Sequence, residues 1–274
     1  MNFRNVGRFA PSPTGILHLG NLRTAVAAQM FAPDGLIVRM EDLDRVTSSR
    51  VLADGQLRDL AAIGIESCEP VVFQSDRFAV YEQHLSRLID QGLTYECFCT
   101  RREIREAAAA PHGDFFVYPG TCRELSDAER EAKRALRQPA VRLRVEENAH
   151  KSAAVDDIVL QRNDGVPAYN LAVVVDDELQ GVTQVVRGID LEPVTPSQQY
   201  LGALLGFRPL SYVHVGLVVG PDGERLAKRH GAVTLADWLS TGRSVSDLRR
   251  VLEKTLQDRE IDAGCPIGDI FSGA

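Results

Sequence analysis

The sequence lacks the features of several specialised protein classes. No apolar run approaches the roughly 20 residues that span a bilayer, and the beginning of the chain lacks the pattern of a secretory signal. Repeats, low-complexity tracts and obvious flexible linkers are absent as well. Neither a G-x-S-x-G motif nor a Cys/His nucleophile signature is present, so chemistry through a protein nucleophile is not indicated. We therefore expect no membrane partner, and we expect the chain in the cytoplasm.

The composition is that of an ordinary globular protein. With 274 residues, of which 44% are hydrophobic and 25% charged, the chain can form one large or two modest domains. The formal net charge of −7 argues against nucleic-acid binding that depends on overall charge. Two groups of arginines could form a local basic face or, equally, be solvated helix faces with acids nearby: Arg101, Arg102 and Arg105, and Arg243, Arg249 and Arg250.

The opening stretch at 7–21, GRFAPSPTGILHLGN, predicts a strand, a rigid loop and a helix. Residues 6–10 can form a short strand, but the two prolines that follow, beginning with Pro11, cannot donate to a ladder. Gly20 permits another group to approach closely, and small, helix-compatible residues fill 19–32. The N-terminus of a helix after such a loop is a natural site for a phosphate group.

Alternating strand and helix patterns along the rest of the chain predict an α/β fold with a mostly parallel sheet. The apolar segment 35–44 ends in acids and is the second strand of a βαβ unit. Ser126, followed three residues later by Glu129, is a capping box that begins a helix. Helices are predicted at 49–63, 77–91, 126–137, 196–205, 234–240 and 246–256, and strands at 140–145, 155–160, 168–175 and 212–219.

Three of the five cysteines, Cys97, Cys99 and Cys122, lie close together in the sequence. In a reducing compartment such a cluster indicates a metal site before it indicates a disulfide. Three thiolates leave one position of a tetrahedral zinc site open, for which His112 is the better general ligand and Glu96 a weaker one. A zinc with four protein ligands is structural and does not touch substrate; the alternative is three reduced cysteines without a metal.

Three motifs, in this order along the chain, resemble those of the class I aminoacyl-tRNA synthetases. PSPTGILHLGN, with His18-Leu19-Gly20-Asn21 at its centre, resembles the HIGH-type signature, and RLAKR at 225–229 resembles the KMSKS loop. The stretch 168–191, AYNLAVVVDDELQGVTQVVRGIDL, resembles the glutamyl-tRNA synthetase branch in particular. Within that branch the chain is most similar to the short glutamyl-queuosine tRNA(Asp) synthetases, which lack the anticodon-binding domain.

This resemblance implies a Rossmann-like class I synthetase catalytic domain with a zinc-bearing insertion and a short helical C-terminal part. The expected domains are 1–93 and 140–232 for the two halves of the catalytic domain, with the KMSKS-like loop in the second half, and 94–139 for the insertion. The segment 233–274 is expected to be a short helical part. No anticodon-binding domain is expected, because about 45 residues after Lys228 are too few for one. We expect a monomer.

The resemblance makes His18 and Lys228 the catalytic residues. An imidazole at a loop-to-helix junction can hydrogen-bond phosphate oxygens, and the ammonium of Lys228 can stabilise the charge that builds up on pyrophosphate. The second signature departs from the commonest pattern at Arg225, Ala227 and Arg229, so Lys228 carries the assignment. The implied ATP-binding residues, with Mg²⁺ accompanying the ATP, are Pro11, His18, Gly20, Asn21 and Lys228.

A glutamate substrate needs an anion site for each carboxylate and an acceptor for its ammonium group. Arg8 offers a bidentate fork, Ser12 a hydroxyl donor, and Glu41 an acceptor at the end of its strand. The resemblance adds Tyr169 and Arg187. A fixed cation at Arg187 should select glutamate over glutamine by a charged hydrogen bond; the alternative is a surface arginine in a Val-Val-Arg-Gly turn.

The resemblance also makes Tyr118 the fourth zinc ligand, although the long spacing to the first two cysteines keeps His112 as an alternative. The expected function is ATP-dependent activation of L-glutamate to glutamyl adenylate, followed by transfer to queuosine in tRNA for aspartate. Three alternatives are a minimal glutamyl-tRNA synthetase that charges the tRNA 3′ end, a catalytically silent zinc-bearing RNA-binding module, and a nucleotidyltransferase that acts on a small cofactor. The last has no need of the glutamate pocket, and the intact signatures argue against the silent module.

Overall fold

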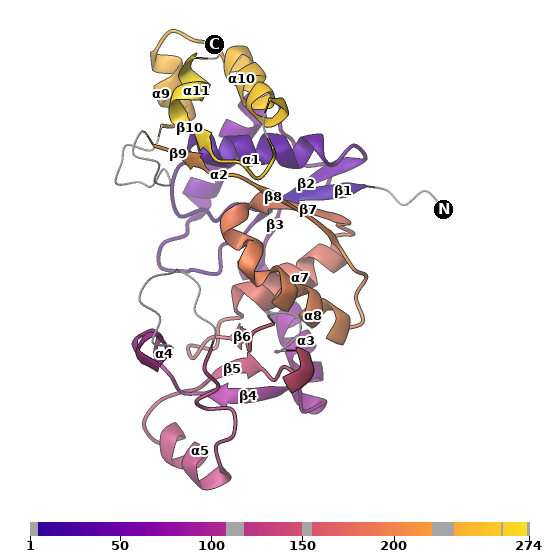
Figure 1. The fold of residues 1–274 in the computed structure, drawn as a ribbon, viewed down its shortest axis with the longest axis vertical. Coiled ribbons are helices and arrows are strands. Elements are labelled where there is room, and N and C mark those ends of the chain that lie inside the picture. The colour runs from indigo at the N-terminus through magenta and orange to yellow at the C-terminus, as the bar shows by residue number, and fades with distance from the viewer. Residues whose placement is uncertain (1–4, 108–117, 150–154, 221–232, 259, 273–274) are drawn as a thin grey trace. The chain divides into compact units, whose positions relative to one another are not determined.

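The computed structural model describes residues 5–107, 118–149, 155–220, 233–258 and 260–272 (Figure 1). The chain divides into two compact units, each built from separate stretches of the sequence. The first unit takes Met1–Asp76, Gln180–Glu192 and Leu210–Ala274, and the second takes Arg77–Leu179 and Pro193–Pro209. The domain boundaries expected from the sequence at 93, 139 and 232 stay predictions.

A five-stranded parallel sheet forms the centre of the first unit, with the strand order β3-β2-β1-β7-β8. The chain enters at β1 in the middle, runs outward through β2 and β3, and returns to the other side of β1 with β7 and β8. The predicted α/β fold with a parallel sheet is therefore confirmed. The strands are β1 (Val6–Phe9), β2 (Gly35–Met40), β3 (Val72–Phe73), β7 (Gln184–Gly188) and β8 (Ser211–Val215).

Helix α1 (Leu19–Met30) joins β1 to β2, packs on β1, β2 and β7, and is covered by α10 (Val245–Gln257) (Figure 1). Its apolar side is lined by buried residues such as Leu22 and Val26, which belong to the main core with Val186 of β7. The other elements of this unit are α2 (Arg50–Ala62), α9 (Leu235–Ser240), α11 (Ile267–Ser272), a short 3-10 segment (Gln74–Asp76) and a small parallel pair of β9 (Val218–Val219) and β10 (Cys265–Pro266). A second 3-10 segment, Ile189–Val194, follows β7 and contains the boundary between the two units in the sequence.

A buried arginine ties α1 to α10 and to the connection after β8. Arg23 of α1 donates to the carbonyl of Gly216 at 2.8 Å and to the hydroxyl and carbonyl of Thr255, each at 3.1 Å. The N–H of Gly216 donates to the carbonyl of Ile261 at 2.9 Å. A Cβ atom at Gly216 would lie 1.9 Å from the carbonyl oxygen of Ala263, so only glycine fits where the C-terminal segment crosses this connection.

The second unit contains a three-stranded antiparallel sheet in the order β4-β5-β6, with helices around it. Within this unit α7 packs against α3, α8 and β6. Asp176 of α7 is fully buried and accepts hydrogen bonds from Arg77 Nε and the Tyr81 hydroxyl, both at 2.8 Å. The elements are α3 (Phe78–Asp90), β4 (Thr94–Cys97), α4 (Arg101–Ala107), α5 (Asp127–Arg134), β5 (Ala140–Leu143), β6 (Val159–Gln161), α7 (Tyr169–Leu179) and α8 (Thr195–Leu204).

The structure corrects three strand predictions. The segment 168–175 forms the start of α7: its run of valines favours a strand by propensity, but a short, continuous apolar run is equally compatible with a buried helix. Residues 155–160 contribute only the end of β6, and 212–219 divide into β8 and β9, which belong to different sheets. The predicted helices agree with the structure, and the capping box of Ser126 and Glu129 is confirmed by reciprocal bonds of 3.3 and 2.8 Å.

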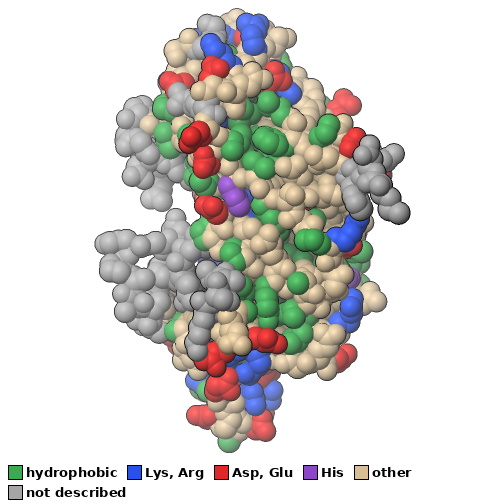
Figure 2. Space-filling model, turned by 45° about the vertical axis from the view of Figure 1, so that its right-hand side comes forward, with side chains coloured by type: hydrophobic (Ala, Val, Ile, Leu, Met, Phe, Trp, Pro, Cys, Tyr) green, Lys and Arg blue, Asp and Glu red, His purple; other side chains and the backbone are tan. Residues whose placement is uncertain are grey.

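The second group of arginines does not form a free basic face. Arg249 pairs with Glu253 at 2.6 Å and Arg250 with Asp247 at 2.8 Å, while the guanidinium of Arg243 lies 4.8 Å from the centroid of the Trp238 ring. Acidic and basic side chains are also mixed on the face shown in Figure 2. Among the described helices, none has the length and apolar composition needed to cross a membrane.

Candidate active site and metal centre

The first signature places His18 at the N-cap of α1. Its Nδ1 accepts from the backbone N–H of Asn21 at 3.3 Å, and the Asn21 side-chain oxygen accepts from the backbone N–H of His18 at 3.1 Å, which completes a capping box. Because Nδ1 is an acceptor here, the proton of the neutral ring is on Nε2, the nitrogen that can donate to an anion. The partial positive charge of the helix N-terminus also attracts an anion to this position.

Gly20 is needed for the position of that imidazole. A Cβ atom at this residue would lie 3.0 Å from both Cε1 and Nδ1 of His18, which is closer than ordinary packing allows. The close approach predicted from the sequence is therefore made by the His18 ring itself. The loop before it is held by the backbone N–H of Glu41, which donates to the carbonyl of Pro11 at 3.0 Å, and that of Ser49, which donates to Pro13 at 3.2 Å.

The residues that follow the second signature in the chain pair with the start of α1. Leu19 N–H donates to the carbonyl of Val233 at 2.8 Å, and His18 forms an isolated antiparallel bridge with Thr234. Lys228 itself, with the rest of 221–232, lies outside the described residues. The first described residues after the second signature, Val233 and Thr234, are thus bonded to the N-terminus of α1.

Two buried arginines lie on the neighbouring strands β1 and β7. Between these two strands the chain changes from building one half of the sheet to building the other. Arg8 of β1 and Arg187 of β7 have exposed fractions of 3% and 4%. Arg8 Nη1 donates to the carbonyl of Val186 at 3.0 Å, and Arg187 Nη2 donates to that of Leu191 at 3.1 Å. The alternative of a surface turn for Arg187 is therefore wrong. The crevice outside the carboxyl ends of strands at such a reversal is where open α/β sheets bind ligands.

Glu41 comes directly after the end of β2, beside the same edge of the sheet. Its carboxylate lies 3.5 Å from Nη2 of Arg39, whose side chain is fully buried and also donates to Gln180 at 2.8 Å. The first unit therefore brings Arg8, Glu41 and Arg187 to the carboxyl ends of three adjacent parallel strands. Ser12 is exposed on the loop after β1, and Tyr169 begins α7 in the second unit.

Two aromatic residues of β8 lie beside Arg187 and are not singled out by the sequence. Tyr212 and His214 lie on one side of the strand with their rings 6.3 Å apart, and the guanidinium carbon of Arg187 lies 5.1 Å from the centroid of the Tyr212 ring. Burial, followed by the charge of Arg187, lowers the pKa of His214. The alternation in SYVHV was the available signal. Both residues line a cleft of about 530 Å³ in the first unit, together with Ile189, Glu192, Glu260 and Asp262.

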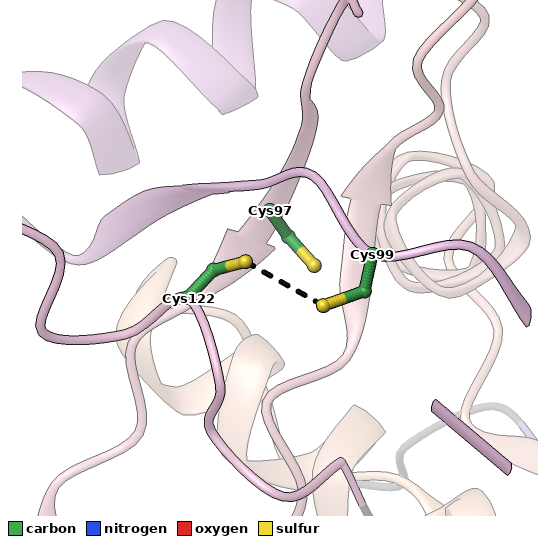
Figure 3. A group of neighbouring side chains, drawn as sticks. All are labelled: Cys97, Cys99 and Cys122. Atoms are coloured by element: carbon green, nitrogen blue, oxygen red, sulfur yellow. Dashed lines mark hydrogen bonds between the residues drawn. The ribbon is translucent and has the colours of Figure 1, made fainter. Parts of the chain in front are cut away.

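The clustered cysteines of the second unit point toward one another (Figure 3). The sulfur atoms of Cys97, Cys99 and Cys122 all lie within 4.8 Å of one another, and those of Cys99 and Cys122 are 3.5 Å apart. The Tyr118 hydroxyl lies 3.4 Å from the Cys97 sulfur and 3.5 Å from the Cys99 sulfur. A tetrahedral zinc with Zn–S bonds of about 2.3 Å has S···S edges of about 3.8 Å and S···O edges of about 3.5 Å. The cluster therefore fits such a metal ion.

Two thiols of the cluster differ strongly in acidity. The hydrogen bond from Cys97, helped by the backbone N–H of Phe98, lowers the pKa of Cys122 to about 6. The same thiol–thiol bond, together with burial, raises the pKa of Cys97 to about 12. Metals bind the thiolate form, so Cys122 supplies a thiolate more readily than Cys97 before a metal arrives.

Neither alternative fourth ligand gains support from the described residues. Glu96 alternates with Cys97 along β4 and therefore points to the other face, where its carboxylate pairs with Arg134 at 2.7 Å. His112 lies outside the described residues, in the segment 108–117.

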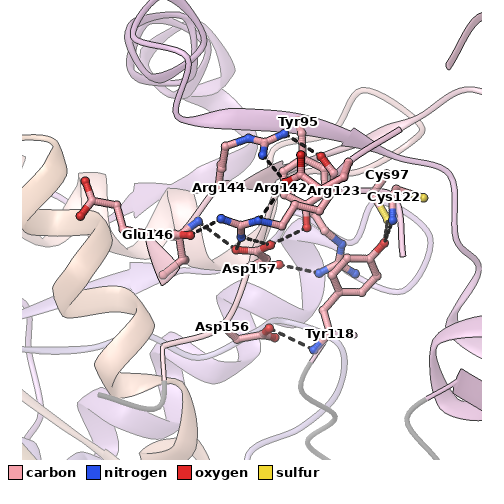
Figure 4. A network of polar contacts seen from close by, with 12 residues as sticks. Tyr95, Cys97, Tyr118, Cys122, Arg123, Arg142, Arg144, Glu146, Asp156 and Asp157 are labelled. Atoms are coloured by element: carbon pink, nitrogen blue, oxygen red, sulfur yellow. Dashed lines mark hydrogen bonds and ion pairs between the residues drawn. The ribbon is translucent and has the colours of Figure 1, made fainter. Parts of the chain in front are cut away.

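A buried ionic network lies next to this cluster and contacts Tyr118 (Figure 4). Asp157 is 1% exposed and accepts from the Tyr95 hydroxyl at 2.7 Å, from Arg123 at 2.7 and 2.8 Å, and from the Val145 N–H at 2.9 Å. Arg142 donates to the carbonyl of Asp157 at 2.6 Å, and its guanidinium carbon lies 3.9 Å from the centroid of the Tyr118 ring. The network thus fixes the ring whose hydroxyl faces the cysteines.

Comparisons with known proteins agree with the motifs. The model of the family "tRNA synthetases class I (E and Q), catalytic domain" matches residues 5–257. The glutamyl-Q tRNA(Asp) synthetase of Nocardia farcinica is 54% identical over 91% of this chain and 84% of its own length, and that of Deinococcus radiodurans is 44% identical over 90% and 88%. A glutamate tRNA ligase structure from Elizabethkingia meningosepticum, at 21% identity, has a TM-score of 0.75 over 98% of this chain and 68% of its own, and shows the fold.

We expect Asp157→Asn to lower the free energy of unfolding by about 3 kcal/mol, because it breaks a buried ion pair and leaves Arg123 facing a neutral group. The matched control is Asp164→Asn, which breaks an exposed pair with Arg162 and should cost less than about 1 kcal/mol. Urea unfolding of both variants measures the difference. Equal losses in the two variants would contradict the role of the buried network.

Proposed function

The chain belongs to the class I tRNA synthetases (E and Q), and we propose that within this family it activates L-glutamate with ATP and transfers the glutamyl group to queuosine in tRNA for aspartate. Relatives named glutamyl-Q tRNA(Asp) synthetase, 43–54% identical over 86–91% of the chain, support this assignment. The structural observation that carries it is the pair of buried guanidinium groups, Arg8 and Arg187, at the reversal point of the parallel sheet.

This pair suits a substrate with more than one negative charge. A buried guanidinium gains from a carboxylate and is poorly matched by a neutral amide, so Arg187 is the residue we propose for choosing glutamate over glutamine. Glu41, held beside Arg39, provides a negative partner for the substrate ammonium. We assign Ser12 and Tyr169 to the same substrate on the strength of the family motifs.

ATP belongs at the N-terminus of α1 in this proposal. His18 presents Nε2–H and Gly20 leaves room for its ring, so Pro11, His18, Gly20 and Asn21 would border the phosphates. Lys228 is proposed to stabilise the charge that builds up on the leaving pyrophosphate, with Mg²⁺ bound to the nucleotide.

The reaction needs positioning and charge stabilisation, and no protein nucleophile. A carboxylate oxygen of glutamate attacks the α-phosphorus of ATP, pyrophosphate leaves, and a mixed anhydride forms. A hydroxyl of the acceptor nucleoside then attacks the anhydride carbonyl and AMP leaves. Arginines that are already buried and hydrogen-bonded need little reorganisation during these steps, which is the condition for effective electrostatic catalysis. We propose the cytoplasm, where tRNA and ATP meet, as the compartment and a monomer as the working form.

We further propose that Cys97, Cys99, Cys122 and Tyr118 hold one structural zinc. The support is the donor set and its spacing, since three thiols and one hydroxyl lie at separations close to those of a tetrahedral zinc site. Four protein ligands leave no open position, so zinc here stabilises the fold of the second unit and takes no part in the chemistry.

Labelled glutamate distinguishes the proposed acceptor, queuosine, from the terminal adenosine of tRNA. Protein incubated with labelled glutamate, ATP and total tRNA from queuosine-containing cells should place the label on a modified nucleoside after nuclease digestion. Total tRNA from cells that lack queuosine is the control and should stay unlabelled. Label on the terminal adenosine would instead identify a minimal glutamyl-tRNA synthetase, and no label in any tRNA would argue for an RNA-binding module.

We expect Arg187→Gln to reduce kcat/KM for glutamate in ATP–pyrophosphate exchange by about a hundredfold, with a much smaller effect on the KM for ATP, because one charged hydrogen bond is lost. The exposed Arg162→Gln is the matched control and should behave as the wild type. If Arg187→Gln still prefers glutamate to glutamine as strongly as the wild type does, the selecting cation lies elsewhere, and Arg8 is the next candidate.

Purified protein should contain about one zinc per chain, and Cys99→Ser should lose it, whereas the exposed Cys68→Ser should keep it. Elemental analysis of protein prepared without chelators measures this directly. Tyr118→Phe and His112→Ala decide the fourth ligand: we expect only the first to weaken zinc retention against a chelator. Metal-free wild-type protein would remove the proposal.

A further inference from the structure

One side chain of α2 reaches the first signature loop. Gln56 is 2% exposed, and its Nε2 donates to the carbonyl of Ser12 at 3.1 Å and to that of Gly15 at 2.8 Å. Two acceptors on one side fix the orientation of the amide, because the opposite orientation would set its oxygen against two carbonyl oxygens.

These two hydrogen bonds differ in kind from the backbone bonds that Pro11 and Pro13 of the loop accept. The carbonyls of Pro11 and Pro13 accept from backbone N–H groups, those of Glu41 and Ser49, which no substitution of a side chain removes. Gln56 instead bridges two carbonyls three residues apart, and so sets the curvature of the turn that leads into His18. The loop between β1 and α1 is thus held to α2 by the side chain of Gln56, so a substitution of this residue removes the contact.

The oxygen of the Gln56 amide indicates that this side chain does more than stabilise the fold. Oε1 of Gln56 is buried and has no hydrogen-bond partner among the described residues, and a buried, unsatisfied acceptor costs stability. An apolar side chain of similar size would avoid this cost. The benefit of glutamine at this position therefore lies in its two donors and in the loop that they hold.

We propose that Gln56 is a positioning residue: it holds the Ser12–Gly15 turn so that His18 and the N-terminus of α1 meet the nucleotide in the right place. This inference rests on the proposed function for its catalytic consequence, although its structural part does not. A displacement of about 1 Å at a reacting centre can cost about a hundredfold in rate. Gln56 touches neither substrate in this account and acts only through the loop.

The decisive variants are Gln56→Leu and Gln56→Glu, with Gln29→Leu as the matched control. Gln29 of α1 also donates through Nε2 to a backbone carbonyl, that of Gly64 at 3.1 Å, but it does not contact the signature loop. In hydrogen–deuterium exchange, peptides covering 11–18 should exchange faster in Gln56→Leu than in the wild type and Gln29→Leu. In pyrophosphate exchange, Gln56→Leu should lose about tenfold to a hundredfold in kcat/KM, with a melting temperature within about 4 °C of the wild type.

The pH profile of Gln56→Glu separates hydrogen-bond donation from packing. A carboxylate would face two carbonyl oxygens, whereas the protonated acid can donate to one of them, so the activity of this variant relative to the wild type should rise as the pH falls. The relative activity of Gln56→Leu should not change with pH. A flat profile for Gln56→Glu would overturn the role of donation.

The remaining outcomes are distinct. Unchanged deuterium exchange in the loop of Gln56→Leu overturns the inference, and so does full activity of that variant beside an active wild type. If the loop exchanges faster but the wild type shows no glutamate-dependent pyrophosphate exchange, the proposed function fails while the positioning of the loop by Gln56 stands.

Discussion

Burying guanidinium groups inside a parallel sheet is the constraint on which the rest of this structure depends. Arg8, Arg39 and Arg187 stand on the adjacent strands β1, β2 and β7, with exposed fractions of 3%, 0% and 4%. Desolvating a charge is expensive. Backbone carbonyls offset this cost for Arg8 and Arg187, and the side chains of Gln180 and Glu41 offset it for Arg39. The result is a sheet edge with fixed positive charge, which we propose as the site of an anionic ligand.

The same part of the fold also positions the residues that we propose for binding the phosphates. Because β1 is the central strand at which the order reverses, the loop that follows it leaves the carboxyl edge of the sheet next to β7, the strand that carries Arg187. That loop ends at His18, whose ring is oriented by Asn21 and lies over Gly20. The proposed carboxylate site and the proposed phosphate site would therefore lie at the two ends of one short segment, Arg8 to Asn21.

Local patterns were predictable from the sequence, and features that depend on distant packing were not. His18 and Gly20, the cysteine cluster and the capping box at Ser126 are set by short spacings. Helix α7 was assigned as a strand because its valines carry the opposite propensity, which burial overrides. Asp157, Tyr212 and Gln56 carry no motif, since each acts through partners distant in the sequence. Lys228 and His112 lie outside the described residues, so their roles stay predictions.

The most direct test of the central claim is a crystal structure with a non-hydrolysable analogue of glutamyl adenylate. The account predicts the side-chain carboxylate of the analogue at about 2.7–2.9 Å from the guanidinium of Arg187, its ammonium beside Glu41, and its phosphate oxygens at the N-terminus of α1. An analogue bound with its carboxylate away from both Arg187 and Arg8 would contradict the account, because the buried cations would then serve the sheet alone.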